Sequence, residues 1–205
     1  MRIGLDFDNT IVCYDDVFHY AALERGLIPA ETPATKDGVR DWLRKAGRED
    51  DWTELQGYIY GARMDLAAPF PGVREFLRDA RASGCDIRIV SHKTRHPYRG
   101  PKYDLHRAAL GWLEAQGFLD GSLGLERDGV FLELTKDDKL ARIGGLACDY
   151  FVDDLPELLG EANFPAATAR VLFDPNDAAP DAPIYRRARS WPEITRTLLG
   201  PSCRH

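Results

Sequence analysis

The sequence predicts an α/β fold, a doubly wound, mostly parallel Rossmann-like sheet accompanied by a small all-helical cap. Short apolar runs typical of buried strands alternate along the chain with amphipathic helical patterns. Such alternation is typical of a parallel sheet covered by helices on both faces. The first apolar run, Ile3–Leu5, is followed by acidic residues and then by a long polar stretch without strand signals.

That long stretch spans residues 14–68 and shows helical spacing of its apolar residues. A crossover between neighbouring parallel strands needs far fewer residues than this stretch contains. We therefore expect 14–68 to form a helical cap, and 1–13 together with 69–205 to form the α/β core. Three cap segments carry the helical spacing, at 17–23, 39–43 and 52–59.

The rest of the chain continues the rhythm of strand and helix. Strands are expected at 86–91, 130–134, 149–154 and 170–174. A helix is expected to start within the segment 69–77, and further helices are expected at 103–116, at 139–144 and at 191–199, with a loop at 180–183.

Composition limits the classes of function. With 205 residues, of which 44% are hydrophobic, the chain can bury one substantial core beside a modest second lobe. Its formal net charge of −6 argues against nucleic acid as a partner, because such proteins present a basic face. No apolar run approaches the roughly 20 residues of a membrane span, so no membrane partner is expected.

The cysteines are scattered and form no C-x-x-C pair, which indicates reduced thiols in a reducing compartment. Because the first strand starts at residue 3, we expect no signal peptide and a cytoplasmic location. The four cysteines are Cys13, Cys85, Cys148 and, in the tail, Cys203.

The most informative segment follows the first strand and reads Asp6-Phe7-Asp8-Asn9-Thr10. The spacing of Asp6 and Asp8 places both carboxylates on the same side of the strand where it leaves the sheet. Two acids packed together repel each other and lose hydration unless a cation lies between them. The segment therefore indicates metal binding or acid–base chemistry, although the same residues are also common in turns.

The pattern D-x-D-x-T after a hydrophobic strand resembles the first motif of the haloacid dehalogenase (HAD) superfamily. Three further motifs follow in the order of that superfamily: a strand that ends at Ser91, a helix opened by Thr135–Lys139, and a strand that ends in Asp153 and Asp154. Together the motifs cover roughly residues 1 to 175. The resemblance implies a HAD-like core with a small helical cap inserted after the first motif.

The resemblance also implies a mechanism. Asp6 would be the nucleophile that forms an aspartyl-phosphate, and Asp8 the general acid/base, which the dehalogenases of the superfamily generally lack. Mg²⁺ would be the cofactor, bound by Asp6, by the backbone carbonyl of Asp8 and by Asp153, while Asp154 orients bound water.

Two positions in the remaining motifs are expected to contact the phosphate. Ser91 ends an apolar strand, where its hydroxyl can donate to phosphate oxygens. The lysine that the superfamily requires is either Lys139 or Lys136, because Thr135 is a candidate N-cap with Asp138 completing a capping box. We favour Lys139, which enters the apolar face of the helix.

Basic residues gather after Ser91, opposite in sign to the rest of the chain. They either recruit a substrate that carries a second anionic group or form a solvated loop balanced by acids of the cap. We expect the substrate to contact Asn9, Thr10, Ser91, His92 and Lys93. The other basic residues of the segment are Arg95, His96, Arg99, Lys102, His106 and Arg107.

The expected function is Mg²⁺-dependent hydrolysis of a small phosphorylated metabolite, such as a sugar phosphate, by a monomer or homodimer. Three alternatives remain open. One is a 5′-nucleotidase-type phosphatase acting on nucleotides. Another is a phosphotransferase or mutase on the same core. The third is a non-catalytic metabolite-binding protein with this fold.

Overall fold

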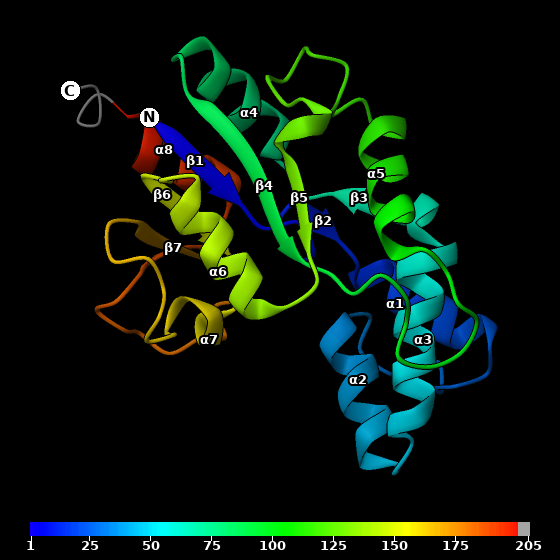
Figure 1. The fold of residues 1–205 in the computed structure, drawn as a ribbon. Helices are drawn as coiled ribbons and strands as arrows, with labels where there is room; N and C mark the ends of the chain where they lie inside the picture. Colours follow the sequence, from blue (N-terminus) through cyan, green and yellow to red (C-terminus); the bar gives the residue numbers. More distant parts are fainter. Residues whose placement is uncertain (201–205) are drawn as a thin grey trace. The chain divides into compact units, whose positions relative to one another are not determined.

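The computed structural model describes residues 1–200, which form two compact units (Figure 1). The first, which we call the sheet unit, consists of Met1–Ile11, Pro69–His92 and the described chain from Gly117 onward. The second, which we call the helical unit, consists of Val12–Ala68 and Lys93–Gln116.

The sheet unit contains a six-stranded sheet in the order β5-β4-β1-β6-β7-β8, in which the neighbouring strands pair in parallel. The predicted α/β class and its parallel sheet are therefore confirmed. The strands are β1 (Arg2–Leu5), β4 (Asp86–His92), β5 (Val130–Glu133), β6 (Tyr150–Asp153), β7 (Ala169–Phe173) and β8 (Arg186–Ala188).

Strand β1 lies in the middle of this sheet, between β4 and β6. Its side chains Ile3 and Leu5 are completely buried. Gly4 is paired with Phe151 of β6, and a Cβ at this glycine would lie only 2.5 Å from the Phe151 ring. The absence of a side chain at Gly4 therefore lets the aromatic ring pack directly on the central strand.

Helices cover the sheet. Helix α6 packs on β4 and β5, α7 packs on β6 and β7, and α4 packs on both β4 and α8. The apolar cluster between α6 and the strands includes Leu140, Ile143, Phe151 and Leu172. The helices of this unit are α4 (Val73–Ala82), η2 (Arg127–Gly129), α6 (Lys136–Gly145), α7 (Pro156–Leu159) and α8 (Trp191–Leu199).

The helical unit is built around an aromatic core. The rings of Phe18 and Trp52 lie 5.0 Å apart, and the ring of Tyr60 lies 5.0 Å from that of Tyr14. The elements are β2 (Val12–Cys13), α1 (Asp15–Glu24), α2 (Lys36–Lys45), α3 (Glu49–Ala62), η1 (Met64–Leu66) and α5 (Leu105–Ala115). The short strand β3 (Ala68–Pro69) pairs with β2 where the chain passes from one unit to the other.

The compact units differ from the predicted domain boundaries in the segment 93–116, which we assigned to the core. Helix α5 packs on α3 and η1, and the indole of Trp112 donates a 2.9 Å hydrogen bond to the carbonyl of Ala67. The apolar face that the sequence predicts for this helix is therefore buried against the other helices of the helical unit.

Other sequence expectations concern short elements and cysteines. Helix α7 and strand β8 were missed, because each is short and β8 reads Arg-Arg-Ala. Cys13, Cys85 and Cys148 are free thiols, and Cys203 lies outside the described residues. Among the helices within residues 1–200, none is both long and apolar enough to cross a membrane.

Candidate active site

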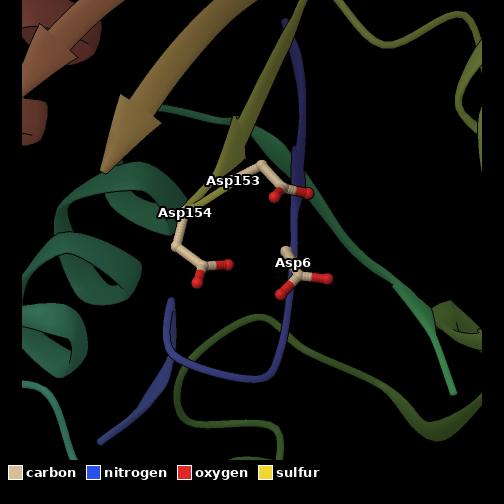
Figure 2. Close-up of side chains that lie close together, drawn as sticks. All are labelled: Asp6, Asp153 and Asp154. Carbon is tan, nitrogen blue, oxygen red and sulfur yellow. The ribbon is translucent and has the colours of Figure 1, made fainter. Parts of the chain in front are cut away.

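Three carboxylates meet where two neighbouring strands end. Strands β1 and β6 pair with Leu5 opposite Val152, so Asp6 and Asp153 occupy adjacent positions at the carboxyl edge of the sheet. Ligand oxygens of Asp6, Asp153 and Asp154 lie within 4.8 Å of one another (Figure 2). Asp6 and Asp153 are almost completely buried, while Asp154 is half-buried.

Lys139 reaches this cluster from helix α6. Its Nζ donates to Asp6 Oδ1 and to Asp153 Oδ2, both at 2.6 Å, and the side chain is buried. The register of α6 follows from its N-cap, because Thr135 Oγ1 accepts the backbone N–H of Asp138 at 3.0 Å. The capping residue therefore places the fourth helical residue, one turn in, next to the strand ends.

The alternative lysine lies elsewhere. Lys136 is exposed at the first position of α6 and forms an ion pair with Glu161. Of the two lysines that the sequence left open, Lys139 lies among the carboxylates and Lys136 does not.

Burial and charge together shift the protonation of the site. Burial raises the pKa of Asp6, the Lys139 ammonium lowers it, and the charges of Asp153 and Asp8 raise it again, to about 7. For Lys139, burial lowers the pKa, but the carboxylates of Asp153 and Asp6 raise it more, so the net shift is upward. The lysine is thus held as a cation, while Asp6 is held close to its point of ionisation.

The donor set fits a hard divalent cation. All three side chains offer carboxylate oxygens, and such oxygens are the ligands that Mg²⁺ prefers. A cation there would also offset the repulsion that raises the pKa of Asp6. Asp6, Asp153 and Asp154 therefore form a candidate metal site.

The loop after Asp6 has an unusual backbone and a buried anchor. Asn9 has a φ of 57°, in the left-handed region that Asn tolerates better than most residues. The carbonyl of Thr10 accepts a 3.1 Å hydrogen bond from the indole of Trp191, and the backbone N–H of Ile11 donates to the carbonyl of Phe7 at 3.0 Å. These bonds fix the loop on which Asp8 lies, half-buried, between Asp6 and Thr10.

Thr10 itself has no exposed surface, and its Oγ1 has no hydrogen-bond partner among residues 1–200. The contact that we expect between Thr10 and a substrate stays a prediction. Trp191, by contrast, was missed by sequence reasoning as a contributor to the site, because it lies 181 residues further along the chain. No local pattern marks such a partner.

The end of β4 carries the next two predicted residues. Ser91 is buried and His92 is exposed, and β4 is the other neighbour of β1 in the sheet. Partial burial lowers the pKa of His92, and the charge of Lys139 lowers it further. Lys93, also predicted to contact substrate, belongs to the helical unit.

The fold and these residues define the class: an α/β protein with a carboxylate cluster and a buried lysine at the carboxyl edge of a parallel sheet. Solved hydrolases of the haloacid dehalogenase superfamily have this fold, which agrees with the predicted fold class. No family model matches the chain, and no curated protein sequence matches it. Similarity to known proteins is therefore found in the comparison with solved structures.

Three of these structures cover nearly the whole chain. A HAD-family hydrolase from Deinococcus radiodurans R1, solved with bound phosphate and sodium, matches with a TM-score of 0.61 at 18% identity, over 98% of this chain and 96% of that chain. Protein tyrosine kinase A of Mycobacterium tuberculosis matches with a TM-score of 0.62 at 17% identity, over 96% and 97%. A predicted phosphoglycolate phosphatase from Haemophilus somnus 129PT matches with a TM-score of 0.55 at 18% identity, over 95% and 96%.

A dehalogenase structure matches as well, with a TM-score of 0.55 at 17% identity, over 96% of each chain. Hydrolases, a kinase and a dehalogenase therefore share this architecture. At such low identities the likeness shows the fold and leaves the activity to be argued from the site.

Proposed function

We propose that this protein is a Mg²⁺-dependent phosphohydrolase that cleaves a small phosphomonoester through an aspartyl-phosphate on Asp6. The observation that carries the proposal is the buried cluster in which Lys139 bonds both Asp6 and Asp153, with Asp154 beside them. A nucleophilic carboxylate, an acidic metal site and a fixed ammonium group are what attack on a phosphate dianion needs.

Asp6, Asp153, Asp154 and the backbone carbonyl of Asp8 would hold the metal ion. When bound, Mg²⁺ would supply positive charge that lowers the repulsion between the carboxylate and the phosphate dianion. The remaining chemistry belongs to the residues of this chain.

In the first half-reaction, a carboxylate oxygen of Asp6 attacks phosphorus, and the bond from phosphorus to the ester oxygen breaks. Asp8, protonated, gives its proton to that leaving oxygen. Lys139, held at 2.6 Å from Asp6, keeps the nucleophile oriented and offsets charge on the transferred group. Ser91, near the end of strand β4, would donate to a phosphate oxygen.

In the second half-reaction, Asp8 takes a proton from a water molecule as the water oxygen attacks phosphorus. The bond from phosphorus to the Asp6 oxygen breaks, which releases inorganic phosphate and restores the carboxylate. Asp8 ends this step protonated, ready for the next turnover.

The acid at Asp8 supports phosphate ester chemistry over dehalogenation, because the resembling dehalogenases generally lack an acid at this position. Hydrolysis and phosphoryl transfer share the first half-reaction and differ in what accepts the phosphoryl group. The kinase among the fold neighbours makes transfer the alternative to measure.

The test is a screen of phosphorylated metabolites and p-nitrophenyl phosphate for phosphate release, with Mg²⁺ and with EDTA. We expect phosphate release that requires Mg²⁺, with sugar phosphates and nucleotides compared directly. If the assay yields a phosphorylated acceptor and no free phosphate, the protein is a phosphotransferase and the proposed hydrolysis is wrong. Binding of metabolites without any turnover, or release of halide from haloacids instead, would overturn the proposal.

A further inference from the structure

The helical unit contains a cavity of about 390 Å³, and all of the cavity's lining residues belong to this unit. Binding sites for small molecules have volumes of roughly 300–1,000 Å³, so the cavity is large enough to hold one. None of the lining residues takes part in the chemistry proposed above. They are Glu24, Arg25, Glu54, Tyr58, Pro101 and Tyr103.

The cavity lies where a loop and the end of helix α1 meet helix α3. Glu54 and Tyr58 are four residues apart on α3 and so share one face of this helix. Two glycines allow the loop to approach α3 closely. A Cβ at Gly61 would lie only 2.3 Å from Tyr103, and one at Gly100 would lie 3.0 Å from Cγ of Glu54. Gly100 also has a φ of 83°, which favours glycine.

Two ion pairs organise the charged groups of the lining. Nη2 of Arg25 lies 3.1 Å from Oε1 of Glu54, and the Arg25 guanidinium carbon lies 4.8 Å from the centroid of the Tyr58 ring. Nη1 of Arg63 lies 3.0 Å from Oε2 of Glu24 and 3.1 Å from the hydroxyl oxygen of Tyr58. Each carboxylate is therefore bound through one oxygen, and its second oxygen accepts no hydrogen bond from residues 1–200.

The charges around the cavity argue against an ion as its ligand. The two glutamates are matched by the two arginines, so the formal charges of these four side chains cancel. A bound cation would be repelled by two guanidinium groups that already lie 4.8 and 6.0 Å from the Tyr58 ring centroid. A bound anion would be repelled by the two carboxylates, and a zwitterion would compete with ion pairs that are already formed. The lining therefore favours an uncharged ligand that forms hydrogen bonds.

Hydroxyl groups match the hydrogen-bonding positions that the lining leaves open. A hydroxyl can donate to the second oxygen of Glu24 or Glu54 without displacing the guanidinium group, and the phenol of Tyr103, which makes no hydrogen bond within residues 1–200, can donate to it in turn. A sugar ring carries several hydroxyls at its edge, and the C–H bonds on its faces can pack against the electron-rich face of an aromatic ring. From this geometry we infer that the cavity binds a saccharide without phosphate or other charged groups.

The saccharide site goes beyond the proposed hydrolysis and does not depend on it. A saccharide without phosphate is no substrate for a phosphohydrolase, so its binding is measured whether or not the protein cleaves any ester. Its hydroxyls would donate to Glu24 and Glu54, and one face of the sugar would pack on a tyrosine ring of the lining.

The first experiment records amide NMR spectra of the nitrogen-labelled full chain during titration with D-glucose, D-galactose and maltose. At least one sugar should shift the amide signals of Glu24, Arg25, Glu54, Tyr58 and Tyr103, and the shifts should saturate. Saturation transfer should also reach the C–H protons of that sugar. If none of the three sugars shifts these signals, or if the shifts lie only outside the cavity, the inference is wrong.

A pair of glutamate variants tests the carboxylate contacts. Glu54→Leu removes an acceptor of the cavity, whereas Glu49→Leu on the same helix removes an exposed carboxylate that pairs with Arg44 outside the cavity. We expect Glu54→Leu to raise the Kd of the bound sugar roughly 10- to 100-fold, as for the loss of a hydrogen bond to a charged group. Glu49→Leu should keep the wild-type Kd. Equal Kd values for the two variants would contradict the inference.

A pair of tyrosine variants tests the aromatic contact. Tyr58→Leu removes a ring of the lining, whereas Tyr20→Leu removes an exposed ring of α1 that also lies near the Arg63 guanidinium, at 5.9 Å. Tyr58→Leu should weaken sugar binding roughly 2- to 10-fold, and Tyr20→Leu should leave it unchanged. Circular dichroism checks the fold of every variant. Where a variant does not fold, the amide shifts of the wild type decide the question.

Charged probes test the class of the ligand. Choline, glycine and sulfate represent a cation, a zwitterion and an anion, and each is titrated into the wild type in the same way. We expect each of them to bind at the cavity more weakly than the sugar. Tighter binding of any charged probe than of every sugar, read from the same amide signals, would exclude a saccharide as the ligand.

Discussion

Asp6 combines two demands that conflict within one side chain. In the proposed mechanism it must be ionised to attack phosphorus, yet its burial and its acidic neighbours favour the protonated form and raise its pKa to about 7. The Lys139 ammonium, which donates to Asp6 at 2.6 Å, offsets the cost of burying the ionised Asp6 carboxylate. The nucleophile is thus poised by its surroundings.

Substituting Asp6 by Asn should abolish phosphate release, because the amide keeps the shape but removes both the nucleophile and a metal ligand. Turnover of p-nitrophenyl phosphate should fall below a tenth of the wild-type rate, and the circular dichroism spectrum should be unchanged. Intact-mass spectrometry must exclude deamidation back to Asp. Activity above that level in a verified Asn protein would rule out the covalent mechanism.

The raised pKa of Asp6 also predicts a pH dependence of stability in metal-free protein. The folded chain keeps a proton on Asp6 that the unfolded chain releases above pH 3.8, up to about 7. Because the folded state then binds more protons, the free energy of unfolding should fall as pH rises through that window. Urea unfolding in EDTA should show this decline in the wild type.

Asp6→Asn cannot ionise at this position and should show a shallower decline over the same pH range. Parallel curves for the two proteins would mean that Asp6 does not titrate in the folded chain as its surroundings imply.

Lys139 and Lys136 offer a paired test of burial. Lys139→Met leaves two buried carboxylates without their ammonium partner, which should cost about 3–5 kcal/mol of unfolding free energy. Lys136→Met breaks an exposed pair with Glu161 and should change the unfolding free energy little, because solvent screens such pairs. Urea unfolding at neutral pH compares them, and equal losses would contradict the assignment of Lys139 to the site.

At the scale of elements, helix α8 serves the loop that follows β1. Its first residue, Trp191, is completely buried, packs against Phe76 and Phe173, and donates to the carbonyl of Thr10. A helix near the end of the described chain thereby fixes the loop that carries Asp8. We regard Trp191 as a positioning residue.

Trp191→Phe should keep most of the ring packing and leave the Thr10 carbonyl without its donor, which costs about 1–3 kcal/mol. The turnover number should fall as well, because the Asp8 loop loses its anchor. Trp112→Phe is the control, since that indole makes a similar buried bond to Ala67 in the helical unit. Equal effects of both substitutions on kcat would show that Trp191 only stabilises the fold.

Sequence reasoning succeeded where the information is local. Apolar alternation located the main strands, and the Thr135 cap fixed the register that places Lys139 one turn into α6. It failed where a partner is distant or an element is short. Strand β8 has too few apolar residues to be predicted from its pattern. No residue near Trp191 in the sequence indicates its hydrogen bond to Thr10.

In the candidate site, too, local features were predicted and contacts between distant segments were not. The acids of β1 and β6 were predicted because each ends a recognisable strand. The packing of α5 on α3 joins segments that are distant in the sequence, and one-dimensional spacing does not encode that packing. The assignment of 93–116 to the core differs from the compact units for the same reason.

At the scale of the molecule, the candidate metal ligands Asp6, Asp153 and Asp154 all belong to the sheet unit, so metal binding should stabilise that unit. Mg²⁺ at about 100 times its dissociation constant would add about 2.7 kcal/mol to the unfolding free energy. We expect Mg²⁺ to raise the melting temperature of the wild type relative to EDTA. If the two units melt separately, only the sheet-unit transition should move.

Asp154→Asn should reduce this shift, whereas Asp137→Asn, an exposed acid on α6, should leave it as in the wild type. A shift that survives in Asp154→Asn and vanishes in Asp137→Asn would place the metal elsewhere.

The bond between Trp191 and Thr10 has a consequence for how the protein is made. The ribosome adds the two partners 181 residues apart, which at about 5–20 residues per second separates them by roughly 10–40 s. During that interval the loop that carries Asp8 lacks its hydrogen bond to Trp191. Strand β1 also lacks its neighbour β6 until residues 150–153 have been synthesised. A chain truncated before Trp191 would therefore contain Asp6, Asp8, Asp153 and Asp154 but would lack the hydrogen bond that fixes the loop carrying Asp8.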